Sequence, residues 1–394
     1  MPLRPPAGYI RPGYDPLKVP NAPTIGTTTG GDASASVEFT APTNVGGSAI
    51  SAYYAVSNPG QFTGTGASSP VSVTGLTNGT AYTFTVWALN TYGPSPYSAA
   101  SGSVTPTAPR GLFGGGNFAG GNTIQYITIS TTGNSTDFGD LIYSEADLGA
   151  CSSSTRALFL GRSKVINYVT IATTGDAANF GNGYNTGSLS YRGVAGCSNS
   201  TRGLWAGNMN SGGSAFVNTI SYSTIATTGD GTYFGDLTVS KNSLGACSST
   251  TRGVFGGGGY PGTAVIGYIT IASTGNATSF GSLTEARYTL AGCSSSTRGL
   301  FGGGGSSAIG NVIDYITIAT TGNATDFGDL TINVEGAAAC SSQTRGVWGG
   351  SYGPNSNVMS YVTIASTGNA TDFGDLIEAG GYRAGCSNAH GGLS

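Results

Sequence analysis

The sequence is poor in charged residues and has almost no histidine. Asp, Glu, Lys and Arg make up 8% of its 394 residues, the net charge is −3, and His390 is the single histidine. Nucleic-acid binding needs clustered Lys and Arg to neutralise phosphates, so this composition argues against it. A hydrolytic triad needs a base, and the sequence offers only one histidine. We therefore expect no enzyme and no cofactor, and a carboxylate pair with one raised pKa is the remaining catalytic alternative.

Long hydrophobic runs are also missing. No apolar stretch approaches the length of about 18 residues that a membrane-spanning helix requires. The opening residues, MPLRPPAGYIRPGYDPLKVP, lack the apolar segment of a secretory signal peptide. We expect a protein that is made in a cytoplasm, is not inserted in a membrane, and reaches any site outside a cell by another route.

Cysteines are few and never form a CxxC pair. Each of the six stands in one copy of a repeated segment, at Cys151, Cys197, Cys247, Cys293, Cys340 and Cys386. The steps between them are 46, 50, 46, 47 and 46 residues. A period of this size, built from short strand-like runs, is typical of a β-propeller. The isolated cysteines predict buried free thiols, with a central metal ring as the alternative.

Each repeat divides into four predicted strands. The first is small and apolar (LAGCSS), the second follows an arginine (RGLFGGG), the third carries a tyrosine (IDYITIAT) and the fourth a phenylalanine (TDFGDL). β-Branched and aromatic residues suit half-buried strands, and small residues suit a crowded centre. The repeated residues are Arg110, Arg156, Arg202, Arg252, Arg298 and Arg345; Tyr126, Tyr168, Tyr222, Tyr268, Tyr315 and Tyr361; and Phe138, Phe180, Phe234, Phe280, Phe327 and Phe373.

The double glycine after the second strand and the pair Arg287–Tyr288 resemble the kelch motif, although the kelch tryptophan of the fourth strand is replaced by phenylalanine. The resemblance implies a six-bladed β-propeller over residues 110–394. The repeat region begins with a second strand at Arg110 and ends with a lone first strand at 383–389. We expect these two segments to pair, which closes the ring and removes the exposed sheet edges.

Two turn motifs allow functional alternatives. The segment GNATDFGD places Asp326 and Asp329 close together, and such a pair could bind Ca²⁺, but Asn and Asp also stabilise turns through their own backbone. The NxT triplets match glycosylation acceptors, yet they recur at one turn position. We favour the turn interpretation for both motifs. The NxT asparagines are Asn134, Asn276, Asn323 and Asn369.

The N-terminal part has a different composition. Residues 1–22 are rich in proline, which favours an extended arm, and we expect it to dock on a neighbouring subunit. A floppy leader is the alternative. Residues 23–107 show strand-like alternation, and GLTNGTAYTFTVWALNTYGPSPYS resembles the fibronectin type III pattern, with Tyr82 as its corner tyrosine. The candidate docking residues of the arm are Tyr9, Ile10, Arg11 and Tyr14.

Sequence differences among the repeats fall in two loops. The turns between strands one and two and between strands three and four are nearly constant, whereas the 2–3 and 4–1 loops differ in length and content. In an up-and-down sheet both variable loops lie at one end, here named the variable face. Aromatic and amide side chains suit adaptable binding surfaces, although simple drift is the alternative. The candidate ligand-binding residues are Asn117, Phe118, Tyr184, Tyr191, Met209, Phe216, Tyr260, Tyr288, Tyr352 and Tyr382.

The leader PLRPPAGYIRPGYDPL and the repeat TIATTGNATDFGDL resemble structural proteins of tailed phages, particularly marine cyanophages. The resemblance implies an oligomeric virion protein of the appendage or fibre type, with capsid, portal or tail proteins as partners and a propeller that contacts host glycans. A purely structural decoration protein is the first alternative, and a glycan-processing enzyme is the second. Release of virions by lysis would explain the missing signal peptide.

Overall fold

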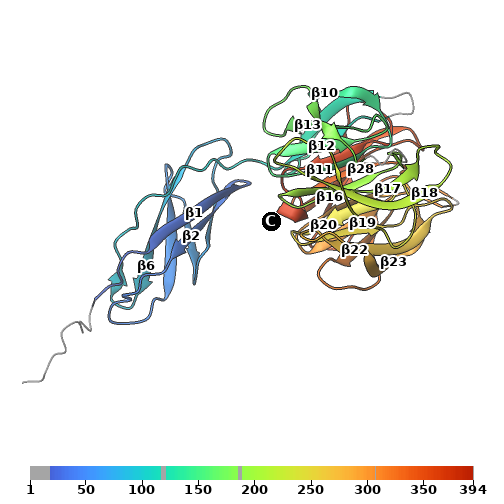
Figure 1. Ribbon diagram of the computed structural model, residues 1–394. Coiled ribbons are helices and arrows are strands. Elements are labelled where there is room, and N and C mark those ends of the chain that lie inside the picture. Colours follow the sequence, from blue (N-terminus) through green and yellow to red (C-terminus); the bar gives the residue numbers. More distant parts are fainter. Residues whose placement is uncertain (1–17, 117–120, 185–188, 307, 394) are drawn as a thin grey trace, which may run out of the picture. The chain divides into compact units, whose positions relative to one another are not determined.

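The computed structural model describes residues 18–116, 121–184, 189–306 and 308–393. It divides into two compact units, Met1–Ala108 and Pro109–Ser394 (Figure 1). The described residues form antiparallel sheets and one short 3₁₀ turn, η1 (Gly391–Leu393), which confirms the all-β class. No helix among them is long and apolar enough to cross a membrane. The docking residues predicted for the arm lie outside the described residues.

The first unit is built from two sheets whose inner faces share one core. Inward positions alternate with outward ones along each strand, as in Ala35, Val37 and Phe39 of one sheet and Phe84, Val86 and Ala88 of the other. One sheet has the order β1 (Thr24–Gly31), β2 (Ser34–Thr40), β5 (Val71–Thr74). The other has the order β4 (Thr63–Gly66), β3 (Ala52–Asn58), β6 (Thr83–Asn90), β7 (Gly93–Pro94).

Tyr82 occupies the place that the sequence predicted for a corner residue. Its side chain is buried, and its hydroxyl oxygen accepts a hydrogen bond of 3.0 Å from the backbone N–H of Thr77. The bond joins the start of β6 to the turn a few residues upstream. It therefore fixes the direction in which the chain enters β6.

The second unit contains six antiparallel sheets in sequence order. The first has the order β32 (Ala384–Ser387), β8 (Arg110–Gly114), β9 (Gly121–Thr128), β10 (Thr136–Glu145). The second has β11 (Gly149–Ser152), β12 (Arg156–Leu160), β13 (Val165–Thr170), β14 (Ala178–Asn182). The third has β16 (Ala195–Ser198), β17 (Arg202–Asn210), β18 (Phe216–Thr224), β19 (Thr232–Asp236), with β15 (Leu189–Ser190) also paired to β17.

The remaining three sheets repeat the same order. The fourth has β20 (Gly245–Ser248), β21 (Arg252–Gly256), β22 (Thr263–Thr270), β23 (Thr278–Arg287). The fifth has β24 (Ala291–Ser294), β25 (Arg298–Gly302), β26 (Val312–Thr317), β27 (Thr325–Asp329). The sixth has β28 (Ala338–Ser341), β29 (Arg345–Ser351), β30 (Ser356–Thr363), β31 (Thr371–Asp375).

The pairing of the C-terminal strand with the strand that begins at Arg110 is confirmed. β32 pairs with β8 in the register Ala384↔Gly114 to Ser387↔Gly111. Each first strand also packs against the first strands of the two neighbouring sheets, and β32 contacts both β28 and β11. The six first strands thus form a closed ring around an axis.

The repeated arginines join each sheet to the next. Each guanidinium lies over the repeated tyrosine of its own sheet, 4.4 to 5.1 Å from the ring centre. Each also donates to backbone carbonyls at the end of the following sheet's third strand, as Arg110 does to Ile171 and Arg345 to Ile129. The contact from Arg345 crosses from the last sheet to the first, so this set of bonds closes on itself.

The repeated turn residues make a second closed set of inter-sheet bonds. Asn134, Asp176, Asp230, Asn276, Asn323 and Asn369 each accept a backbone N–H from the fourth strand of the preceding sheet, at 2.8 to 3.1 Å. These bonds give the NxT asparagines a structural role between sheets, which differs from the predicted bonds to their own backbone. The predicted turn chemistry is present at Asp326, whose carboxylate accepts the N–H of Gly328 at 3.2 Å.

Candidate functional site

The 4–1 loops meet around the axis at the variable face. One residue of each loop, four positions before the cysteine, has a left-handed φ of 52 to 66°. Each of these residues donates its backbone N–H to the equivalent carbonyl of the preceding repeat, at 2.6 to 3.2 Å, and the six bonds form a closed circle. β-Branched and bulky residues rarely adopt this φ, so the circle holds a strained rim. The six residues are Asp147, Gly193, Ser243, Thr289, Gly336 and Tyr382.

Four of the predicted ligand-binding tyrosines come together beside this rim. Tyr260 and Tyr288 form an edge-to-face pair with ring centres 5.4 Å apart. Tyr352 and Tyr382 form a tilted pair at 5.1 Å. Glu335 lies between the pairs: it accepts a 3.3 Å hydrogen bond from the Tyr382 hydroxyl and lines a pocket with Tyr288. We call these five residues the tyrosine cluster.

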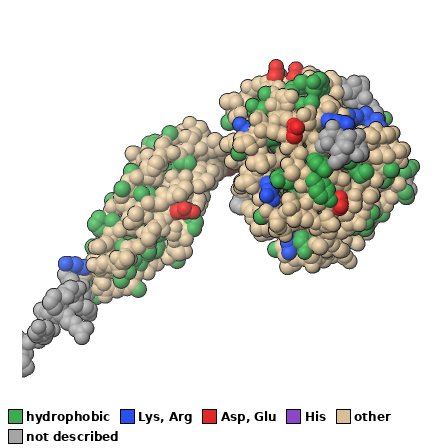
Figure 2. Space-filling model, in the orientation of Figure 1, with side chains coloured by type: hydrophobic (Ala, Val, Ile, Leu, Met, Phe, Trp, Pro, Cys, Tyr) green, Lys and Arg blue, Asp and Glu red, His purple; other side chains and the backbone are tan. Residues whose placement is uncertain are grey.

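The tyrosine cluster is open to solvent and negatively charged. Tyr260 is 72% exposed and Tyr352 is 45% exposed. Burial and the Glu335 carboxylate raise the pKa of Tyr288, and the same two causes, with Asp147, raise the pKa of Tyr382. Elsewhere charge is sparse, and Figure 2 shows mostly uncharged polar side chains and backbone on the face in view. A carboxylate framed by aromatic rings is therefore a distinct chemical feature of this surface.

Glu335 was not among the residues predicted from the sequence. It stands five positions before Cys340, and Tyr288 stands five positions before Cys293. The two are therefore structural equivalents in neighbouring repeats, which explains why both face the same pocket. Alignment of the 4–1 loops on their cysteines would have revealed Glu335.

The other predicted ligand-binding residues do not join the cluster. Met209 and Phe216 are half-buried and face each other across the β17–β18 hairpin. Tyr184 pairs with Tyr233, with ring centres 5.8 Å apart. Asn117 and Phe118 lie outside the described residues.

The prediction for Tyr191 is wrong. Its side chain is fully buried, and its hydroxyl donates to the backbone oxygen of Tyr184 at 2.7 Å. Tyr191 stands six positions before Cys197, and the residues at this offset in other repeats are buried as well, whatever their chemistry. They are Glu145, Lys241, Arg287 and Val334. This position points between sheets, so a tyrosine there fills space and cannot reach a ligand.

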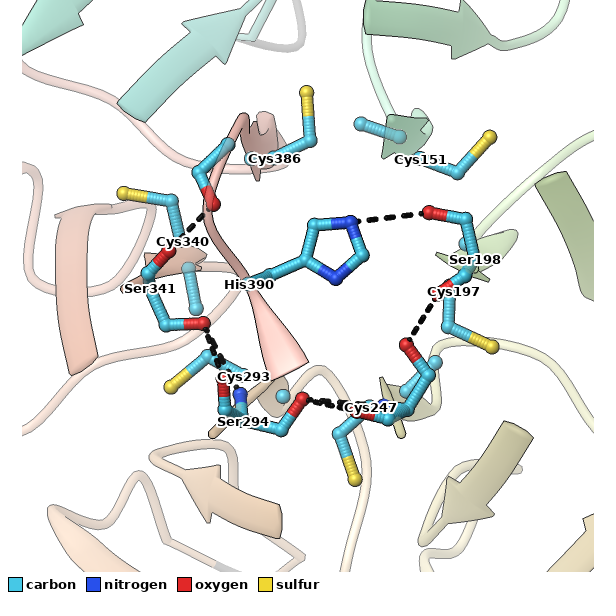
Figure 3. Close-up of a pocket in the computed structure, with 18 of the residues that line it drawn as sticks. Cys151, Cys197, Ser198, Cys247, Cys293, Ser294, Cys340, Ser341, Cys386 and His390 are labelled. Carbon is cyan, nitrogen blue, oxygen red and sulfur yellow. Dashed lines mark hydrogen bonds between the residues drawn. The ribbon is translucent and has the colours of Figure 1, made fainter. Parts of the chain in front are cut away.

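A second candidate site lies on the axis, inside the ring of first strands. Six buried serines, one after each cysteine, surround it (Figure 3). Each hydroxyl donates to the backbone carbonyl of the serine in the preceding repeat, at 2.5 to 2.8 Å, and the circle closes from Ser152 to Ser387. The other members are Ser198, Ser248, Ser294 and Ser341. Because all six serine hydroxyls donate within this circle, none of them is left to donate to a ligand.

His390 fills the middle of the serine circle (Figure 3). Its Nδ1 accepts the backbone N–H of Gly392 at 3.1 Å, so the proton is on Nε2, which lies 3.1 Å from the carbonyl oxygen of Ser152 and 3.2 Å from the Ser198 hydroxyl. The turn η1 packs against β16, β20 and β24. The C-terminal segment thus plugs this end of the axis, and the pocket is a packing site with little room for a ligand.

The plug should make stability depend on pH. Loss of hydration lowers the pKa of His390 from 6.5 to about 4, and no charged side chain lines the pocket. Protonation therefore favours the unfolded chain, so the contribution of His390 is complete above pH 6.5 and is lost as the pH falls toward 4. The expected loss is about 3 kcal/mol, or roughly 6 to 12 °C in thermal midpoint.

Thermal melts between pH 7.5 and 4.5 measure this effect. The His390→Gln variant keeps a donor for the carbonyl of Ser152 but cannot titrate at this position. Its remaining pH dependence therefore measures the contribution of the carboxylates. Wild-type protein should lose more stability than this variant over the range. Equal pH dependence of the two proteins would contradict a neutral, partly buried His390.

The cysteines are buried free thiols, as predicted. Their sulfur atoms point away from the axis (Figure 3), and five of the six lie close to where a Cβ would stand at the first glycine of the next repeat, as Cys151 does at Gly203. Cys386 packs instead in a cluster with Ala157, the one repeat where alanine replaces that glycine. Burial raises the pKa of Cys197 and of Cys386 to about 12, which keeps these thiols protonated and unreactive.

Comparison with protein-family models finds no match, and comparison with curated proteins finds no significant relative. The function is therefore argued from the geometry of the described residues. In that part of the chain, no group of three His, Cys, Asp or Glu side chains is placed to hold a metal ion.

Proposed function

We propose that the protein is a non-enzymatic virion protein of a tailed phage, of the appendage or fibre type. In this proposal the arm docks on a virion partner, a fibronectin type III-like domain acts as a spacer, and a six-bladed kelch-like propeller presents the variable face to glycans on the host. The resemblance of the leader and the repeats to phage structural proteins supports the virion assignment.

Several observations support the finer fold assignment. A six-bladed propeller requires six sheets of four strands, with the first strands in a closed ring. The observed strand orders and contacts fit this requirement, and the last strand of the chain completes the first sheet. Two observations support a fibronectin type III-like sandwich. The first unit has the two sheets β1-β2-β5 and β4-β3-β6-β7, and the Tyr82 hydroxyl accepts the hydrogen bond expected of a corner tyrosine.

The tyrosine cluster is the observation that carries glycan attachment. Tyr288 and Tyr382 lie beside the carboxylate of Glu335, and the exposed Tyr260 and Tyr352, which come from other loops, pair with these two rings. Aromatic faces can cover the apolar faces of a sugar ring, and the Glu335 carboxylate accepts hydrogen bonds from hydroxyl groups. Tyrosines also lose little conformational entropy when they are immobilised by a ligand.

Binding of the purified full-length protein to a glycan array and to bacterial cells tests this proposal. The double variant Tyr260→Ala/Tyr352→Ala should lose at least about tenfold in affinity, because both rings are exposed anchors of the site. Tyr143→Ala is the matched control, since Tyr143 is 50% exposed on β10 and lies outside the cluster. Unchanged binding by the double variant, or no binding by the wild-type protein, would favour a decoration role.

A further inference from the structure

The pocket between the tyrosine pairs has a defined wall. It is lined by Tyr288, Gly305, Ser306, Ala308, Ile309 and Glu335, and its volume is about 90 Å³. Two backbone bridges, Tyr288↔Gly305 and Gly305↔Ile309, shape this wall. This volume is well below the range for drug-sized ligands, which starts at about 300 Å³, so the pocket suits one small group of a larger ligand.

The charge around the pocket has one sign. Glu335 is the single charged residue among those that line it. The nearest cations are already engaged: Arg287 is buried and paired with Asp314, and Arg383 is buried and donates to the carbonyl of Gly115. The field at the pocket is therefore negative, with little screening by protein cations.

The aromatic rings reinforce that field. The face of a tyrosine ring carries negative charge density, and a cation over such a face gains about 0.5 to 2 kcal/mol. The Tyr382 hydroxyl donates to the carboxylate of Glu335, Tyr288 lines the same pocket, and Tyr260 and Tyr352 pair with these two rings. A hydrogen bond between a charged donor and a carboxylate is about twice as strong as a neutral one. Both effects act on the same kind of ligand group.

We infer that the pocket recognises a positively charged ammonium group, carried by an amino sugar with a free amine. The inference rests on the proposed function, since it names the glycan class for the same site. The ammonium group donates to Glu335 and lies against Tyr288, while neighbouring sugar rings contact the exposed Tyr260 and Tyr352. An acetylated amine has the same sugar backbone but no charge, so it loses both electrostatic contributions.

Isothermal titration of the full-length protein at pH 6 compares two matched probes, a chitosan trisaccharide with free amines and the fully N-acetylated chitin trisaccharide. The chitosan probe should bind about tenfold more tightly. The difference should shrink in 1 M NaCl, where charge interactions are screened over about 3 Å. Glu335→Gln should remove the difference, and Glu38→Gln, a change at an exposed residue of β2, should leave it intact.

The outcomes separate this inference from the proposed function. Equal binding of the two probes, or binding of neither while array glycans still bind through the tyrosines, overturns the ammonium assignment and leaves glycan attachment in place. If the folded Glu335→Gln variant still prefers chitosan, the ammonium group of the ligand does not bind at Glu335, and its placement in this pocket is overturned. Loss of all glycan binding by the wild-type protein would overturn the proposed function and this inference together.

Discussion

Deletion of residues 381–394 is expected to abolish the cooperative unfolding transition of the second unit. The deletion removes β32, leaves β8 as an exposed edge and opens the ring between β28 and β11. It also breaks the serine circle at Ser387 and the rim at Tyr382. The deletion thus opens the ring of first strands, the serine circle and the rim, and together these losses should exceed about 5 kcal/mol, the lower range of a whole domain's stability.

Thermal melts monitored by circular dichroism measure the effect of this deletion. A shorter deletion, residues 391–394, removes η1 but keeps β32 and His390, and serves as the graded control. The shorter variant should retain a cooperative transition at a lower midpoint. An unchanged midpoint after deletion of residues 381–394 would show that the ring does not depend on its last strand.

Gly292→Ala is expected to cost about 1 to 3 kcal/mol, because a Cβ at this position overlaps the backbone carbonyl of Ala246 in the neighbouring first strand. Backbone atoms cannot move aside as a flexible side chain can. Gly322→Ala is the matched control, since a Cβ there meets no atom within 4 Å. Chemical denaturation of the two variants compares the same substitution in a crowded and an open place.

The result also tests how the ring is packed. The residues directly before the cysteines alternate between alanine and glycine around the axis, and each glycine faces the carbonyl of the preceding alanine. Such alternation can close only with an even number of repeats. Equal stability of Gly292→Ala and Gly322→Ala would mean that the inner strands have room to spread. The alternating residues are Ala150, Gly196, Ala246, Gly292, Ala339 and Gly385.

The repeat allowed much of this arrangement to be predicted. Strand order, the pairing of the C-terminal segment with the strand at Arg110, and the burial of the cysteines all follow from residues that recur at fixed positions. The repeat also predicts that Tyr260, Tyr288, Tyr352 and Tyr382 lie close together. Their loops occupy the 2–3 and 4–1 positions of each repeat, and these loops lie at one end of the sheets.

The failures have a common physical cause. Residue type alone does not tell an exposed tyrosine from a buried one, so Tyr191 was misplaced although its offset from Cys197 marks an inward position. Glu335 was missed because its partner Tyr382 lies 47 residues away in the sequence. The left-handed rim could not be predicted, because Ser243, Thr289 and Tyr382 are not residues that favour this φ.

Glycan-array binding by the full-length protein, beside its Tyr260→Ala/Tyr352→Ala variant, decides whether the tyrosine cluster is a ligand site. We expect signals for glycans with free amines from the wild-type protein, and their loss in a variant whose thermal midpoint is unchanged. Signals of equal strength from both proteins would contradict a ligand site at the tyrosine cluster.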